Sequence, residues 1–108
     1  LKEAKKMKWF KKALMNVCDE IDGSENYIKA ALAMQSTDED IADMYCKMAE
    51  QEMNHAMNNK DIAEKLMEKA KREENPDYET MQTIYDFEAD KNLDWIKQVK
   101  LLIAMYKE

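Results

Sequence analysis

Glu52 and His55 form the pair of side chains in this sequence whose types and spacing suit metal or acid–base chemistry. They lie three residues apart in an uninterrupted helical pattern, so both project from one face of a helix. The same face continues in both directions as an apolar stripe of Ile41, Tyr45, Met48, Ile62 and Leu66. An unpaired carboxylate and imidazole buried on such a stripe would cost several kcal/mol. We therefore expect the pair to be compensated, and a Glu-x-x-His pair facing into a helical bundle is how carboxylate-bridged metal sites are built.

Two carboxylates on the first predicted helix can supply a further ligand. Glu20 lies within the apolar arc of that helix, and Glu25 lies near the opposite edge of the arc. A hairpin that turns near Ser36 places Glu52 opposite about Ile21, which favours Glu20. Glu25 stays as the second candidate.

Glu88 is the candidate ligand on the third predicted helix, where it falls on the apolar stripe. In a simple hairpin Glu88 is level with about Ala63, roughly 16 Å along the axis from Glu52. This separation is too large for a shared metal ion. Three alternatives stay open: the second helix breaks near Asn59, Glu88 acts from another subunit, or Glu88 is not a ligand.

The composition predicts an all-α protein with three long helices. The 108 residues include one Gly and one Pro and are rich in Ala, Lys, Glu and Met, which favours helix throughout. We expect one domain of three helices over 2–35, 38–74 and 77–106. The segment Ser36–Asp40 provides a break and a new helix cap, and Pro76 separates the second helix from the third. Gly23 predicts a kink or a close helix contact.

Charge and hydropathy exclude several classes of partner. The net charge of −6 argues against binding to nucleic acid or to anionic membrane surfaces. No apolar run approaches the roughly 20 residues of a membrane-spanning helix, and no signal peptide is visible. We therefore expect a cytoplasmic protein. Cys18 and Cys46 are predicted to lie about 13 Å apart along the hairpin and to be reduced.

Two short motifs carry a resemblance to a known family. The first helix has Glu20, then Tyr27 seven residues later, then Ala30-Ala31. The second has Ala49-Glu50-Gln51-Glu52-Met53-Asn54-His55-Ala56, similar to an Ala-Glu-x-Glu-x-x-His-Ala run. These motifs and the interval between them resemble the rubrerythrin branch of the ferritin-like superfamily. The resemblance covers about the first 65 residues.

The resemblance implies a ferritin-like bundle with a non-haem di-iron site. Glu20 would be a terminal carboxylate, Glu52 a bridging carboxylate and His55 a nitrogen ligand, with Tyr27 beside them. Manganese or zinc suits the same donors. The activities of relatives are Fe(II) oxidation, iron storage and reduction of O₂ or peroxide, which would make the chain a ferroxidase- or peroxidase-type oxidoreductase.

The chain departs from that family in ways that predict a dimer. Family members have four helices and two Glu-x-x-His-type half-sites, whereas this chain has three predicted helices and a single His. It also has no Cys-x-x-Cys pair, which excludes electron transfer through a rubredoxin-like centre. A symmetric homodimer would supply four carboxylates and two imidazoles, as in the encapsulated ferritins, which carry half a bundle per chain.

The alternative function is a metal-free helical assembly or adaptor module. In that case the bundle persists without the chemistry, and Glu52 and His55 form a hydrogen-bonded polar pair. Broad apolar arcs and ten Met residues suit this alternative, because they leave a hydrophobic face for a partner.

Overall fold

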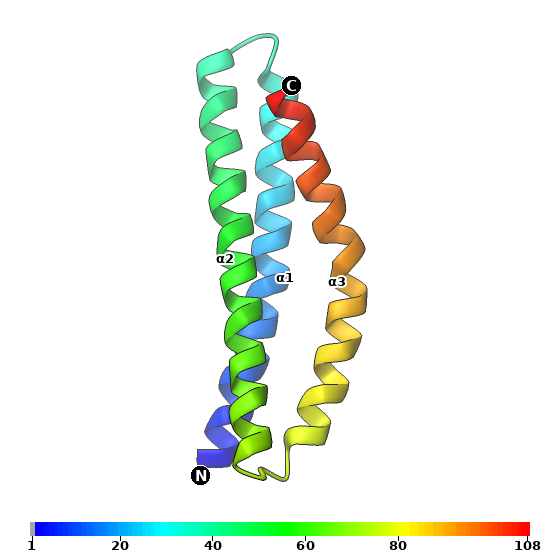
Figure 1. Ribbon diagram of the computed structural model, residues 1–108. Helices are drawn as coiled ribbons and strands as arrows, with labels where there is room; N and C mark the ends of the chain where they lie inside the picture. Colours follow the sequence, from blue (N-terminus) through cyan, green and yellow to red (C-terminus); the bar gives the residue numbers. More distant parts are fainter. Residues whose placement is uncertain (1) are drawn as a thin grey trace.

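The computed structural model describes the backbone of residues 2–108 and the side chains from Lys5 onward. It contains three α-helices, α1 (Lys2–Met34), α2 (Glu39–Arg72) and α3 (Tyr78–Lys107), joined by two short turns (Figure 1). No strand occurs between residues 2 and 108. The all-α prediction is confirmed, and each helix ends within about two residues of its predicted limit.

An antiparallel hairpin of α1 and α2 forms the main body of the molecule. Buried side chains recur at alternating intervals of three and four residues on both helices, which is the heptad pattern of coiled-coil packing. On α1 they are Phe10, Leu14, Val17, Ile21, Ser24, Ile28 and Ala31. On α2 every seventh residue is a fully buried alanine: Ala42, Ala49, Ala56, Ala63 and Ala70. Small side chains let the two backbones approach closely, and Ser24 Oγ donates a hydrogen bond to the Ala49 carbonyl at 2.7 Å.

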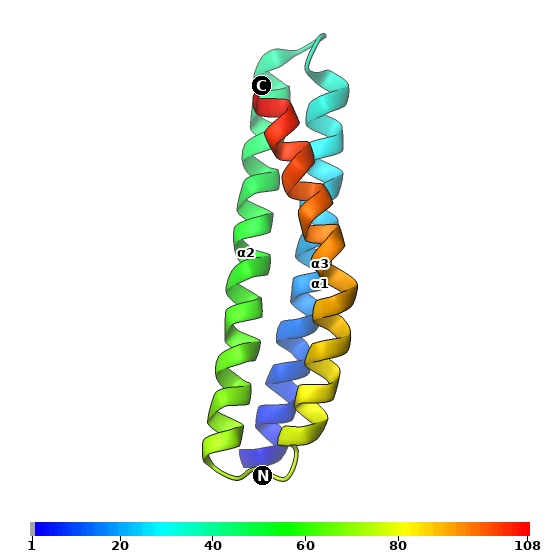
Figure 2. The same ribbon diagram turned by 45° about the vertical axis from the view of Figure 1, so that its right-hand side comes forward.

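The third helix covers one side of this hairpin (Figure 2). Tyr85, near the start of α3, donates a hydrogen bond to Glu64 of α2. Near the end of α3, Gln35 Nε2 donates to the Tyr106 carbonyl at 3.0 Å. The molecule is long and thin, with principal extents of 56 × 22 × 15 Å. None of the three described helices lies over the opposite side of the hairpin.

Two local expectations for α2 are corrected by the structure. First, three apolar residues of the stripe predicted to be core are on the surface of the chain: Ile41, Met48 and Ile62 are 41%, 36% and 49% exposed. The core row lies one position further along the helix, at the alanines. Second, α2 does not break near Asn59, because the helix is continuous from Glu39 to Arg72.

The cap of α2 lies within the predicted segment Ser36–Asp40. The Asp38 side chain accepts a hydrogen bond from the Ile41 amide at 3.3 Å. A carboxylate at this position also complements the positive end of the helix dipole.

Candidate metal centre

Glu20 of α1 and Glu52 and His55 of α2 converge on the uncovered side of the hairpin. His55 Nδ1 lies 3.5 Å from Glu52 Oε1 and 3.9 Å from Glu20 Oε2. The two carboxylate side chains are largely buried, at 19% and 29% exposed, whereas His55 is 57% exposed. The group is therefore a shallow site that opens to the surface, and the expectation of a buried His55 is wrong for the single chain.

The hairpin itself positions this group. Gly23, the only glycine in the sequence, lies opposite Glu52, about two residues from the predicted level of Ile21. A Cβ built on Gly23 would lie 2.8 Å from Glu52 Oε2. The glycine therefore provides the space that the Glu52 carboxylate occupies, and the prediction of a close contact at Gly23 is confirmed.

Asn59 is a member of the site that sequence reasoning did not identify. Its Nδ2 donates a hydrogen bond to Glu20 Oε1 at 2.9 Å. Burial raises the pKa of the Glu20 carboxyl, and the negative charge of Glu52 also raises it, while the Asn59 hydrogen bond and His55 act in the opposite direction. The helical spacing of four from His55 was the available signal, because it places Asn59 one turn further along the same face.

Two carboxylates and one imidazole are donor types that iron, manganese and zinc accept. A metal bound at about 2.0–2.2 Å holds neighbouring donor atoms roughly 3 to 4 Å apart, and both His55 separations fall in this range. Within the described part of the chain, however, no group of three or more His, Cys, Asp or Glu side chains is already arranged to hold a metal ion. Binding would require the side chains to adjust, and three protein donors would leave coordination positions open.

The other predicted site residues lie elsewhere. Glu25 pairs with Lys29 at 3.7 Å. The Glu88 carboxylate of α3 lies 3.6 Å from the Cys18 thiol of α1 and forms an ion pair with Lys91 at 3.5 Å. These two carboxylates are not brought into the group formed by Glu20, Glu52 and His55.

Tyr27 lies on the same side of the hairpin as the group. Its ring stacks on Tyr45 of α2, with centroids 6.2 Å apart. The structure thus places Tyr27 in an aromatic pair between α1 and α2, on the uncovered side.

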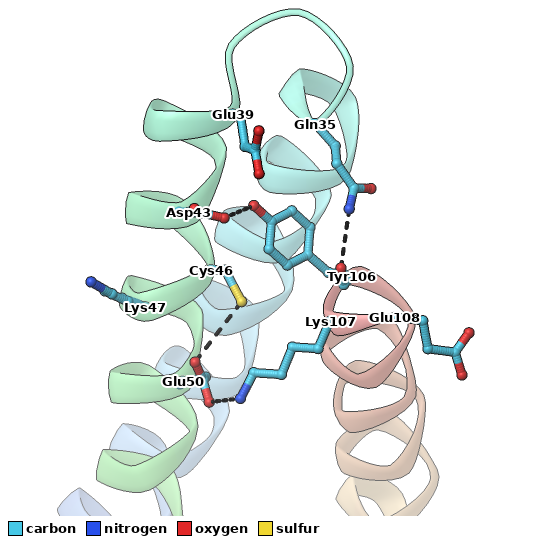
Figure 3. A pocket seen from close by; sticks show the side chains of 9 residues that line it. All are labelled: Gln35, Glu39, Asp43, Cys46, Lys47, Glu50, Tyr106, Lys107 and Glu108. Carbon is cyan, nitrogen blue, oxygen red and sulfur yellow. Dashed lines mark hydrogen bonds and ion pairs between the residues drawn. The ribbon is translucent and has the colours of Figure 1, made fainter.

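A second polar cluster closes the end of the bundle where α3 finishes (Figure 3). The Tyr106 hydroxyl donates a hydrogen bond to Asp43, and Lys107 Nζ lies 2.5 Å from Glu50 Oε2. The Cys46 thiol lies 3.9 Å from Glu50 Oε1. Together with neighbouring side chains they line a hollow of about 620 Å³.

The electrostatics of this end cluster favour a structural role. Burial and the negative charge of Glu50 raise the pKa of the Cys46 thiol, so the reactive thiolate is disfavoured. The hydrogen bond to Asp43 raises the pKa of Tyr106 to about 12, which keeps its hydroxyl protonated as a donor. The cluster therefore fastens the end of α3 to α2.

Comparisons of the chain with protein-family models, curated proteins and solved structures found no match. None of the helices between residues 2 and 107 combines the length and apolar character needed to cross a membrane. Because no comparison found a match, the resemblance to the rubrerythrin branch rests on the motif residues alone. The chemistry of the site is argued from the geometry of Glu20, Glu52 and His55.

Proposed function

We propose that this chain is a ferritin-like, non-haem metal-binding protein in which Glu20, Glu52 and His55 are the ligands of one half-site. The convergence of two carboxylates and one imidazole around His55 Nδ1 is the observation that supports the proposal. Carboxylate oxygens and imidazole nitrogen suit iron, manganese and zinc. Iron is the metal that the resemblance favours.

The half-site needs a second copy of the chain to become a di-metal centre. The three donors face the uncovered side of the hairpin, and His55 is largely exposed. Two such groups brought face to face would provide four carboxylates and two imidazoles, which is the ligand set of di-iron bundles. In such a homodimer, helices of the second chain would also cover the side of the hairpin that α3 leaves open.

Each residue has a distinct part in the proposed site. Glu52, whose carboxylate lies against Gly23, would be the bridging ligand that the resemblance implies. Glu20, held by Asn59, would be a terminal ligand. Bound iron would supply electrons for the reduction of O₂ or peroxide, which is the basis of Fe(II) oxidation and iron storage in the family that the chain resembles.

A metal-free assembly module is the second candidate function. The observation in its favour is that no described group of side chains is already arranged around a metal position, while large apolar side chains are exposed on α2. In that case Glu52 and His55 would be a polar pair within a docking surface.

Metal loading separates the two functions. The chelator-stripped protein is incubated anaerobically with Fe(II), and in parallel with Mn(II) and Zn(II), then desalted and assayed by elemental analysis. The proposal predicts about one metal ion retained per chain with at least one of the three. Retention of none would overturn the metal function and leave the assembly module.

A further inference from the structure

The buried row of α3 is interrupted in the first half of the helix. Between Met81 and Asn92 no residue of α3 is buried, a gap of about three helical turns. Figure 1 shows α3 bowing away from α1 over this stretch. The α1 residues at this level are nevertheless core residues, because Leu14 and Val17 are 7% and 3% exposed. Apolar side chains of the hairpin therefore lie beneath a part of α3 that does not pack closely on them.

A hollow of about 230 Å³ lies at this place, and residues of all three helices line it. We call it the α3 hollow. Its apolar walls come from α1 and α3: Leu14, Val17, Ala89, Leu93 and Ile96. Tyr85 adds an aromatic wall, and Lys60 is the lining residue from α2. An apolar cavity of roughly 150 Å³ is enough to hold benzene. The α3 hollow is therefore large enough for a molecule of one or two fused rings.

Most polar groups that line the α3 hollow already have partners in the chain. Lys60 Nζ donates a hydrogen bond to Glu64 Oε2 at 2.9 Å. The Tyr85 hydroxyl donates to the same carboxylate oxygen. Glu88 forms an ion pair with Lys91 at 3.5 Å. These groups are satisfied by the protein itself, so they do not require a ligand.

Asn92 is the buried exception. It is 4% exposed, and both polar atoms of its side chain meet the Cys18 sulfur, Nδ2 at 3.5 Å and Oδ1 at 3.7 Å. Sulfur is a weak hydrogen-bonding partner, and the thiol has a single proton. The same thiol lies 3.6 Å from Glu88 Oε2, and a carboxylate accepts hydrogen bonds more strongly than an amide. When the thiol donates to Glu88, Asn92 Oδ1 has no donor among the described residues.

This unpaired oxygen defines the kind of molecule that the α3 hollow suits. A buried amide oxygen without a donor is costly, so a ligand that supplies an N–H or O–H group is favoured. Water is a poor filler, because a buried water needs roughly two to four polar partners and most of the walls are apolar. A cation is disfavoured because an amide oxygen does not neutralise a buried charge. The complementary ligand is therefore neutral and mostly apolar, with one donor.

We propose that the α3 hollow binds a small neutral aromatic molecule of one or two rings with a single N–H or O–H donor, the chemical class of indole and phenol. The donor would bond to Asn92 Oδ1, and the rings would pack between Leu14 of α1 and Leu93 of α3. Rigid rings lose little conformational freedom on binding, and the Tyr85 ring can pack against them edge to face. This site is separate from the group around His55 and does not depend on the proposed metal function.

Methyl NMR of the full chain, with isotope-labelled Leu, Val and Ile side chains, tests the location and the ligand together. Indole is the probe, and indene, a bicyclic hydrocarbon of similar size without the N–H group, is the comparison. Indole should cause saturable shifts of the methyl signals of Leu14, Val17, Leu93 and Ile96, and none at Leu101, which is exposed further along α3. Indene should bind about 3- to 10-fold more weakly, because it leaves Asn92 Oδ1 without a donor.

Filling the α3 hollow should prevent binding. Ala89→Phe adds a ring at a lining position, whereas Ala104→Phe adds the same ring at an exposed position of α3 and is the matched control. The affinity for indole should fall at least ~10-fold in Ala89→Phe, because the new ring takes the place of the ligand, and should be unchanged in Ala104→Phe. Circular dichroism shows whether each variant folds.

Asn92→Leu provides a second test that does not depend on the folding of Ala89→Phe. Leucine has a size similar to that of asparagine but has no hydrogen-bonding group, so this variant should bind indole and indene with equal affinity. The ratio of the two affinities reports the hydrogen bond, since a general loosening of the helices would change both affinities together.

The outcomes decide the site and the class of ligand separately. Saturable shifts at the lining methyl groups that are lost in Ala89→Phe support the site. No saturable shift with indole, or equal affinity in Ala89→Phe and the unaltered protein, would overturn it. Indene that binds as tightly as indole, or a preference for indole that persists in Asn92→Leu, would overturn the role of Asn92 and with it the proposed class of ligand.

Discussion

Gly23 of α1 lies so close to Glu52 of α2 that a Cβ on the glycine would be 2.8 Å from Glu52 Oε2. A glycine in the middle of a helix costs about 1 kcal/mol relative to alanine. In this hairpin the cost coincides with the position of the central carboxylate of the proposed site.

The Gly23→Ala variant should separate stability from metal binding. The new methyl group meets the end of a flexible side chain, so Glu52 can move aside, and the metal-free protein should gain up to about 1 kcal/mol from helix propensity. Metal affinity should fall by about 10- to 100-fold, as for changes that misplace a ligand. Urea unfolding and metal titration measure the two effects. Asn26→Ala, on an exposed position of the same helix, is the control and should leave affinity unchanged.

Removal of a ligand should abolish metal binding while leaving the helices in place. Glu52→Gln and His55→Gln each remove one donor, so retained metal should fall below a tenth of an ion per chain, with unchanged far-ultraviolet circular dichroism. Glu25→Gln is the matched control, because the Glu25 carboxylate forms an ion pair with Lys29 and is not part of the group around His55. Full metal retention by either ligand variant would contradict the assignment.

Glu88 provides a test of which carboxylates belong to the site. It contacts Cys18 and Lys91 between α1 and α3. We therefore expect Glu88→Gln to retain the same metal content as the unaltered protein in elemental analysis. Loss of metal in this variant would show that Glu88 reaches the centre, for example from another subunit.

The Tyr106 hydrogen bond to Asp43 should make stability fall at high pH. The folded-state pKa of Tyr106 is raised from 10 to about 12 because its hydroxyl donates to Asp43. The contribution to stability is therefore complete below pH ~10 and is lost as the pH rises toward 12. Chemical denaturation between pH 8 and 12 should show this loss. Tyr106→Phe should reduce it, whereas Tyr78→Phe, whose hydroxyl bonds to Gln82 within α3, should not.

The helices and their ends were predictable from the sequence because the signals are local. The break at Ser36–Asp40 and the Pro at position 76 end helices through backbone chemistry that acts within a few residues. The proximity of Glu20, Glu52 and His55 also followed from hairpin register. Gly23 was informative for the same reason, since a mid-helix glycine indicates a close approach.

The choice of the buried face of α2 was not predictable from side-chain hydrophobicity. Ile41, Met48 and Ile62 are more hydrophobic than the alanines at Ala42, Ala49 and Ala63, yet the alanines are buried. Both rows have heptad spacing, and close packing against α1 selects small residues over large ones. The bond between Tyr106 and Asp43 was not predictable either, because it depends on where the end of α3 meets α2.

The most direct test of the proposed di-metal centre is native mass spectrometry of the protein after anaerobic loading with Fe(II) and desalting. It reports the number of chains and the number of metal ions in the same particle. We predict a dimer that carries two iron ions and loses both together in Glu52→Gln. A particle without metal after loading with iron, manganese or zinc, whether monomer or dimer, would contradict the account.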